Sequence, residues 1–265
     1  MESKEAQGHI HPISQAIFDI RSIFEELGFA IAVGPELETE WYNFDALNIP
    51  NDHPARDMQD TFWVKTKNVK SEIRNPKSET NSNIQIQKEE NGERSERPVL
   101  RTHTSPVQIR YVENKVKLGI KPPYKIVVPG KVFRNEATDA THEAQFFQLE
   151  GLYIDKNVSL AHLKGTLEFF LKKFFGPEIE IRFRPSFFAF TEPSAEVDMK
   201  WKGKWLEVLG SGLMHPNVLR ASGIDPKEYS GFAFGCGIDR LVMLKTGIPD
   251  VRMFYNGDLR LVNQF

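Results

Sequence analysis

A run of charged, polar and aromatic residues in the middle of the chain carries the strongest chemical signal. In the segment VFRNEATDATHEAQFFQLEG, Arg134 and Glu136 follow one predicted strand, while Phe146, Gln148 and Glu150 occupy alternate positions of the next. Because side chains alternate between the two faces of a strand, the last three lie on one face. Arginine donates two parallel hydrogen bonds to phosphate, and an aromatic ring stacks on a nucleobase. The segment fits a nucleotide site, and it also fits an ordinary charged surface hairpin.

The segment RTHTSPVQIR is typical of a helix that begins after a strand. Thr104 or Ser105 suits the N-cap position, and Pro106 suits the first turn. Exposed amides and the helix dipole at such a terminus favour an anionic ligand group, which makes His103 and Ser105 candidate binding residues. The same residues are also those of a simple helix cap.

The segment GFAFGCGIDR predicts a strand, a tight glycine turn and a helix. Gly235 and Gly237 would let a ligand approach the backbone closely, and Arg240 would project from the following helix. The segment lacks the third glycine of a dinucleotide fingerprint, and the P-loop pattern occurs nowhere in the chain. A nucleotide site and a strained strand-to-helix corner both fit these residues.

Aromatic and acidic residues alternate in the second half of the chain. The segment RFRPSFFAFTEPSAEVD places Phe188 and Phe190 on one face of an extended run, followed by acidic residues that begin at Glu192. The rings suit a core strand or an aromatic pocket. Glu207 interrupts the apolar run WLEVLG, and a carboxylate there needs a partner such as arginine or Mg²⁺. The histidines show no HExxH pairing, which argues against a catalytic zinc.

Composition limits the class of protein. The chain has 265 residues, of which 40% are hydrophobic and 11% aromatic, as in a folded globular domain. Its single cysteine, Cys236, excludes an internal disulfide and a thiolate zinc cluster, and it fits a reducing cytoplasm. No signal peptide is visible, and no run approaches the roughly 18 apolar residues of a membrane span. With 34 basic and 36 acidic side chains, any nucleic-acid binding has to be local.

Hydrophobic periodicity predicts the elements that must position these residues. Helices are predicted over residues 10–27, 36–47, from about 105, over 160–175 and over 238–245. Strands are predicted over residues 29–33, 125–134, 145–154, 178–185, 195–201, 204–210 and 231–235. Because the strands cluster and do not alternate with helices, the predicted fold class is α+β, with an antiparallel sheet flanked by helices.

Residues 65–98 differ from the rest of the chain because they contain only four apolar side chains. Little burial would offset the entropic cost of ordering them. We therefore expect a polar, flexible insertion within a single domain that spans residues 1–265. The turn-rich stretch over residues 48–60 is expected to be an ordered loop.

Taken together, these segments closely resemble the α subunit of bacterial phenylalanyl-tRNA synthetase, a class II aminoacyl-tRNA synthetase. The resemblance spans about residues 11–265 except the insertion, and the segments follow in the same order. GFAIAVGPELETEWYNFDALNIP resembles motif 1 with Pro35 as its proline, FRNE through FFQLEG resembles motif 2, and GFAFGCGIDR resembles motif 3. DHPARDMQDTF, RTHTSPVQIR and FTEPSAEVD resemble segments particular to the phenylalanine enzyme.

The resemblance implies the class II synthetase fold and a two-step reaction. Phenylalanine and ATP would give phenylalanyl-adenylate and pyrophosphate, and the amino acid would then pass to tRNA. Carried over by position, Arg134 would hold the α-phosphate and Arg240 the γ-phosphate, as the catalytic pair. Phe146 would stack on adenine, with Glu136 near its amino group and His142 also contacting ATP. Gly235 and Gly237 would belong to the same ATP site.

The resemblance also implies an amino-acid site and a metal. Four polar residues would orient the ammonium and carboxylate groups of the substrate: His103, Ser105, Gln148 and Glu150. Phe188 and Phe190 would pack edge-to-face on the substrate ring, and Ala233 would set the pocket depth. Glu192 matches the family's magnesium position, and Glu207 is a weaker candidate for Mg²⁺ bound to ATP.

The implied partners are tRNA(Phe) and a β subunit, in a cytoplasmic α₂β₂ heterotetramer in which editing belongs to the β subunit. Family members usually begin with a helical arm that contacts tRNA, whereas here the first residues lead straight into the motif 1 region. Autonomous tRNA docking is therefore not expected. Two alternatives stay open, namely a related class II synthetase for another amino acid and a non-catalytic synthetase-like regulator. The aromatic pair favours phenylalanine, and the presence of both arginines disfavours a regulator.

Overall fold

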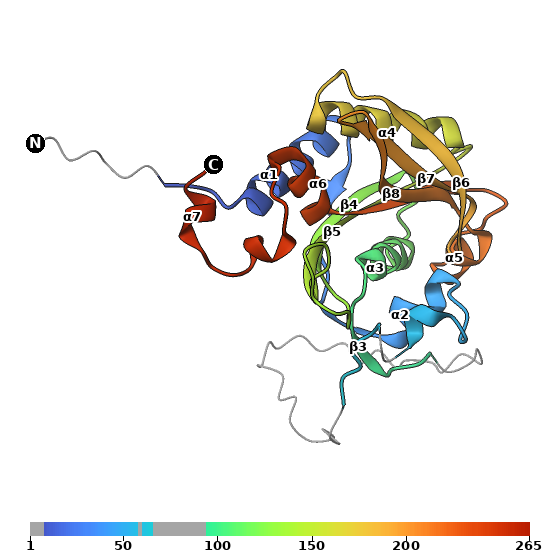
Figure 1. Cartoon of the computed structure of the whole chain (residues 1–265). Helices are drawn as coiled ribbons and strands as arrows, with labels where there is room; N and C mark the ends of the chain where they lie inside the picture. Colours follow the sequence, from blue (N-terminus) through green and yellow to red (C-terminus); the bar gives the residue numbers. More distant parts are fainter. Residues whose placement is uncertain (1–7, 58–59, 66–93) are drawn as a thin grey trace, which may run out of the picture.

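A computed structural model describes residues 8–57, 60–65 and 94–265 (Figure 1). The predicted insertion over residues 65–98 therefore falls mostly outside the described residues, since only its ends are included. No helix of the described ranges is both long and apolar enough to cross a membrane.

Among the described residues, seven strands form the main sheet in the order β1-β4-β5-β9-β8-β7-β6. Their bounds are β1 Ala30–Ile31, β4 Tyr124–Phe133, β5 Gln145–Asp155, β6 Ile181–Phe188, β7 Thr191–Trp201, β8 Lys204–Met214 and β9 Ser230–Gly237. All neighbours pair antiparallel except β1 and β4, which are parallel. The prediction of an antiparallel sheet is confirmed apart from this edge. A parallel pair needs a crossover connection, and the long excursion between β1 and β4 supplies one.

The predicted helices after residue 100 and at the start of the chain are confirmed. Their bounds are α1 Pro12–Glu26, α3 Ser105–Lys117, α4 Leu160–Phe175 and α6 Ile238–Thr246. Ser159 forms a capping box at the start of α4, because its side chain and that of His162 exchange hydrogen bonds with backbone amides. Beyond the end of α1, Gly28 adopts a φ of 76°, a left-handed conformation that suits glycine.

The prediction of one helix over residues 36–47 is confirmed only in part, because a strand replaces its start and two short helices replace the rest. Leu37–Thr39 instead forms β2, which pairs antiparallel with β3, Pro98–Leu100. Two short turns follow, α2 Glu40–Asn43 and the 3₁₀ helix η1 Asp45–Leu47. Residues 98–100 complete this small sheet, and such a partner distant in sequence overrides a local helical pattern.

The loop over residues 48–60 is ordered where the structure describes it, in residues 48–57 and residue 60. It contains the 3₁₀ helix η2 Pro54–Arg56, and the buried Arg56 guanidinium lies 2.7 Å from a carboxylate oxygen of Asp45. The remaining short elements are α5 Pro216–Ala221, η3 Val251–Phe254 and α7 Leu259–Val262.

The main sheet separates two hydrophobic clusters. α1, α4 and α6 cover one face, where Val127, Leu149 and Phe234 are buried. α3 and α5 lie on the other face, together with η1, and there Ile126 and Leu152 are buried (Figure 1). Neighbouring residues of one strand thus enter different clusters, as the two-residue period of a strand requires. Even-numbered side chains of β5 therefore share the face of α3.

Candidate active site

Two adjacent pockets open among the described residues, and Arg134 lines both of them. The first has a volume of about 310 Å³ and the second about 250 Å³. The first is lined by Arg134, Glu136, Thr141, His142, Glu143, Phe146, Gly237, Asp239, Arg240, Met243, Leu244 and Val251. It therefore brings together the residues expected at ATP, except Gly235, which lines the second pocket.

β4 and β5 position the first wall of this pocket. Arg134 follows β4, and its guanidinium carbon lies 5.1 Å from the centroid of the Phe146 ring on β5. Its Nε donates to the carbonyl of Thr102 at 3.3 Å, and its Nη1 lies 3.9 Å from a carboxylate oxygen of Glu136. The predicted alternation is confirmed, because Phe146, Gln148 and Glu150 lie at alternate positions of β5. Phe146 lines the first pocket, and Gln148 and Glu150 line the second.

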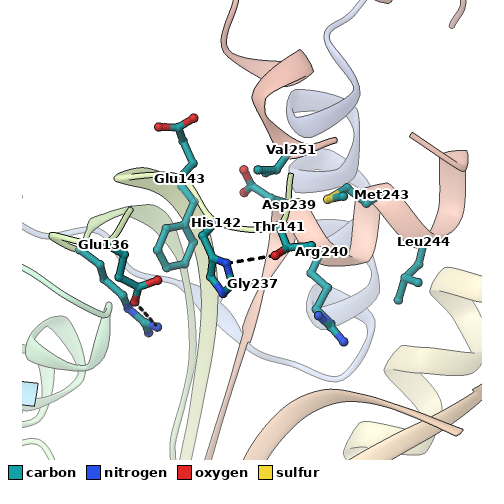
Figure 2. A pocket seen from close by; sticks show the side chains of 12 residues that line it. Glu136, Thr141, His142, Glu143, Gly237, Asp239, Arg240, Met243, Leu244 and Val251 are labelled. Carbon is teal, nitrogen blue, oxygen red and sulfur yellow. Dashed lines mark hydrogen bonds and ion pairs between the residues drawn. The ribbon is translucent and has the colours of Figure 1, made fainter. Parts of the chain in front are cut away.

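The loop between β4 and β5 places His142 at the pocket (Figure 2). Asp139 organises this loop by accepting the backbone amides of Thr141 at 2.6 Å and of His142 at 2.9 Å. The ring Nδ1 of His142 also lies 3.0 Å from Asp139 Oδ2. These hydrogen bonds, first that from the Thr141 amide, hold the pKa of Asp139 below its usual range.

The predicted tight glycine turn is wrong, because β9 continues through Gly235 and Gly237 and passes directly into α6. Both glycines pair with β5, where Gly237 lies opposite Gln148 and Gly235 opposite Glu150. A Cβ at position 235 would come within 3.1 Å of Glu150 Cγ, so a larger residue here would press on the Glu150 side chain. Arg240 projects from α6 and donates from Nε to the carbonyl of Glu207 at 3.2 Å.

Figure 2 shows Glu136 and Arg240 on either side of His142 in the first pocket. Glu136 and His142 belong to the loop after β4, whereas Arg240 belongs to α6. Residues about a hundred positions apart in the sequence thus border one cavity.

The second pocket is organised around Glu150, which is buried and accepts four hydrogen bonds. The donors are the Thr104 amide at 3.2 Å, the Ser105 hydroxyl, Gln108 Nε2 at 3.3 Å and Gln148 Nε2 at 3.1 Å. Burial raises the pKa of Glu150 to about 7, although the Ser105 and Thr104 donors oppose that change. Of the two predicted N-cap candidates, Thr104 occupies the N-cap position, although its side chain forms no cap hydrogen bond. Ser105 is the first helical residue, and its hydroxyl donates to Glu150.

His103 lines the second pocket, close enough to Arg134 for the charge of the guanidinium to act on its ring. Both of its ring nitrogens are buried, and within the described ranges the ring approaches the backbone of Asn43 without a well-formed hydrogen bond. Burial, together with the positive charge of Arg134, lowers the pKa of His103 to about 3. The ring is therefore neutral at physiological pH. The amide oxygen of Gln148 is likewise buried without a partner among the described residues.

Aromatic residues form the apolar end of the second pocket. β6 ends at Phe188 and Phe190 lies in the turn to β7, so the predicted extended run does not reach Phe190. Their rings are nonetheless stacked, with centroids 5.7 Å apart and planes at 11°. Ala233 lines the same pocket from β9. A Cβ at Gly210 would lie 2.8 Å from Phe188 Cζ, so this glycine makes room for the ring.

The two carboxylates expected at a metal lie apart. Glu207 lines the second pocket, its side chain is 57% exposed, and it lies 4.0 Å from Arg184 Nη2. Glu192 lines neither pocket, its side chain is 74% exposed, and it lies 3.4 Å from His215 Nε2. Within the described ranges, no group of three or more His, Cys, Asp or Glu side chains could hold a metal ion.

Sequence reasoning missed several pocket residues. Gln108 follows Ser105 by one helical turn, so its position on the same helix face could have been inferred from spacing. Asp239 precedes Arg240, and no local pattern marks it as buried. Leu47, Met214 and Val218 line the second pocket from three separate elements, which only the tertiary structure brings together.

Comparison with known proteins places the whole chain in one family. The family model of the class II tRNA synthetase core domain matches residues 1–265. The phenylalanine-tRNA ligase alpha subunit of Shouchella clausii is 50% identical over 98% of this chain and 69% of its own length. Those of Pelodictyon phaeoclathratiforme and Synechocystis are each 48% identical, over 97% and 99% of this chain and 70% and 69% of their own lengths.

A solved structure, the pyrrolysyl-tRNA synthetase of Desulfitobacterium hafniense, has a similar fold. It aligns with a TM-score of 0.65 over 92% of this chain and 73% of its own, at 17% sequence identity. The chain belongs to the class II tRNA synthetases and, within them, to the family of phenylalanine-tRNA ligase alpha subunits.

Proposed function

We propose that this chain is the catalytic alpha subunit of a phenylalanine-tRNA ligase, which activates phenylalanine with ATP and transfers it to tRNA(Phe). The observation that carries this proposal is the position of Arg134 on the shared border of the two pockets. One pocket offers a ring and a second arginine, as a nucleotide requires. The other offers a buried carboxylate and an aromatic end, as phenylalanine requires.

The chemistry suits a site without a general base. The carboxylate oxygen of phenylalanine attacks the α-phosphorus of ATP, and the bond from that phosphorus to pyrophosphate breaks. The attacking carboxylate is already ionised at neutral pH, so no proton has to be removed. Catalysis then consists of alignment and of neutralising the charge that develops at the α-phosphate. Arg134 is placed for that role at the border of the pockets.

The second pocket supports binding of the amino acid. Glu150 and the free amide oxygen of Gln148 are acceptors for the substrate ammonium group. Ser105 and the neutral His103 lie beside them and can orient the substrate carboxylate. The Phe188 and Phe190 rings face the substrate ring, and Ala233 limits the depth of the pocket.

The first pocket supports binding of ATP. Phe146 provides the ring surface for adenine, with Glu136 and His142 as polar neighbours in the same wall. Arg240 on the opposite wall is the candidate for the γ-phosphate. The backbone at Gly237 lines the pocket beside it.

Mg²⁺ usually binds one or two protein carboxylates together with substrate phosphates. Glu207 fits this requirement, because it lines the second pocket with an exposed side chain and its carbonyl accepts from Arg240, which lines the first pocket. Glu192 does not lie with it. When bound, Mg²⁺ would neutralise phosphate charge. We assign Glu207 as its protein ligand in this chain, whereas the position of Glu192 outside both pockets does not support a role at the same ion.

The alpha subunit family implies a partner subunit, and we infer a β subunit in an α₂β₂ assembly. The continuous main sheet supports a single catalytic domain. The single cysteine of the chain supports a cytoplasmic location.

The deciding experiment is ATP–pyrophosphate exchange across the twenty amino acids, measured with and without the β subunit. We expect exchange that depends on phenylalanine and is lost in Arg240→Ala. Exchange that prefers another amino acid would replace phenylalanine as the substrate. If no amino acid supports exchange in the complex, the chain is not a catalytic subunit.

A further inference from the structure

A buried carboxylate that the proposed reaction does not use lies at the first pocket. Asp239 stands in the first turn of α6 and is only 3% exposed. Its Oδ2 accepts the amide of Phe147 at 2.8 Å, and its Oδ1 accepts the hydroxyl of Tyr255. Burial raises the pKa of Asp239 to about 6, and these two donors oppose the change. We call the Phe147 amide, Asp239 and Tyr255 the brace.

The brace lies next to the end of the pairing between β5 and β9. β5 and β9 are paired as far as Gln148 and Gly237, after which the chain turns into α6. The Phe147 amide therefore faces no strand, and the Asp239 carboxylate provides its acceptor. A buried N–H without an acceptor would cost about 1–3 kcal/mol. The Asp239 carboxylate thus accepts the hydrogen bond that a strand carbonyl would otherwise accept, and it links β5 to α6.

The residues next to the brace are those proposed for the two ends of ATP. Phe146 precedes the bonded amide, and Arg240 follows Asp239; both line the first pocket. Figure 2 shows the Asp239 carboxylate and the Arg240 guanidinium pointing in opposite directions from α6. The hydrogen bond from the Phe147 amide to Asp239 therefore links the strand that carries the proposed adenine ring surface to the helix that carries the proposed γ-phosphate arginine. A misplacement of about 1 Å in such groups can cost about 10² in rate.

Tyr255 connects the brace to the loop that carries His142. It directly follows η3, in which the Val251 amide donates to the Ala140 carbonyl at 2.9 Å. The same short segment thus holds the loop after β4 and donates to Asp239. We propose that Asp239 is a positioning residue that fixes the separation of Phe146 and Arg240 for ATP. This inference rests on the proposed ATP site.

The test compares Tyr255→Phe and Asp239→Asn with matched controls in the complex of this chain with its β subunit. Tyr153→Phe and Asp155→Asn are suitable controls, because the Tyr153 hydroxyl donates to Asp155 at 3.0 Å at the other end of β5. ATP–pyrophosphate exchange gives kcat and the KM values for ATP and phenylalanine. We expect Tyr255→Phe to raise the KM for ATP about tenfold, the lower end for a hydrogen bond to a charged group.

Asp239→Asn should raise the KM for ATP further, because the side-chain amide keeps one acceptor oxygen and places an NH₂ group against the other donor. The KM for phenylalanine should stay within about twofold of wild type. The lost hydrogen bond lies at the first pocket and shares no partner with the residues proposed to bind phenylalanine in the second pocket. The two control variants should retain wild-type KM values. If Asp239→Asn does not fold, Tyr255→Phe alone decides the test.

Two results would overturn the brace. One is an unchanged KM for ATP in Tyr255→Phe when the wild-type complex shows normal exchange with phenylalanine. The other is an equal rise in both KM values together with a lower melting temperature, which is the signature of a purely structural role. Failure of the proposed function looks different, since the wild-type complex would then show no exchange. In that case, calorimetric titration of wild type and Tyr255→Phe with a non-hydrolysable ATP analogue still tests the brace.

Discussion

The guanidinium of Arg134 lies over the ring of Phe146, with its central carbon 5.1 Å from the ring centroid. Cation–π contacts of this kind contribute about 0.5–1 kcal/mol at exposed sites. The register of β4 and β5 produces the contact, because Val132 pairs with Phe146 and Arg134 follows two residues later. The proposed adenine ring surface thus helps to orient the arginine proposed for the α-phosphate.

Arg134→Lys should show that the shape of this side chain matters as well as its charge. Lysine keeps the positive charge but loses the planar fork that stacks and forms paired hydrogen bonds. We expect kcat for pyrophosphate exchange to fall about 10²-fold, as when one preorganised donor to a transition state is removed. Arg182→Lys is the control, because Arg182 lines neither pocket and pairs with Asp198. A lysine variant with near-normal kcat would contradict the assignment.

Glu150 should make phenylalanine binding depend on pH. Burial raises its pKa to about 7, and only the ionised carboxylate attracts the substrate ammonium group. The KM for phenylalanine should therefore rise as pH falls below about 7, approaching about tenfold per pH unit. The KM for ATP, measured in the same exchange assays, serves as the internal control. A pH-independent KM for phenylalanine would rule out this role for Glu150.

The same group should also affect stability. The pKa of Glu150 is higher in the folded state than its ordinary value of 4.5, so the folded state binds the proton more tightly. The free energy of unfolding should therefore decrease as pH rises from about 4.5 to about 7, because the buried group then has to ionise. Denaturant titrations at several pH values measure this slope, and Glu150→Gln should flatten it. An unchanged slope in that variant would assign the effect to other groups.

Ala233→Gly should enlarge the second pocket and admit phenylalanines with a para substituent. The Ala233 side chain lines this pocket from β9, and removal of one methyl group changes discrimination by roughly 10- to 200-fold in apolar sites. Exchange with para-chlorophenylalanine relative to phenylalanine measures the change. An unchanged selectivity ratio would mean that Ala233 does not limit the substrate ring.

Gly210→Ala should disturb the aromatic end of the second pocket. The new Cβ would lie 2.8 Å from Phe188 Cζ and would displace the ring. Overpacking of this kind costs about 1–3 kcal/mol, so we expect the KM for phenylalanine to rise roughly tenfold. Unaltered phenylalanine binding by this variant would show that the Phe188 ring does not contact the substrate.

Gly165→Ala is the matched control for that variant. Gly165 lies within α4, and a Cβ there meets nothing within 4 Å. The kinetic constants should therefore stay at their wild-type values. The free energy of unfolding should increase by about 0.5–1 kcal/mol, because alanine loses less backbone entropy than glycine in a helix.

The sequence by itself determined the features that depend on local spacing. The two-residue alternation of β5 places Phe146, Gln148 and Glu150 on one face, and helical spacing predicts α1, α3, α4 and α6. The structure agrees with these patterns because each helix or strand buries the face on which its own apolar residues lie. The order of the segments was also sufficient to suggest the family.

The tertiary structure decided what depends on partners distant in the chain. Residues 37–39 form a strand because they pair with β3, whereas local periodicity predicted a helix there. Glu150 receives the Gln108 donor from 42 residues away, and Asp239 receives the Phe147 amide from 92 residues away. Such contacts follow from the packing of whole elements, and nothing in the spacing of neighbouring residues encodes them. For that reason the sequence predicted the residues of the site, while only the fold showed that Arg134 joins two pockets and that Asp239 spans the gap between β5 and α6.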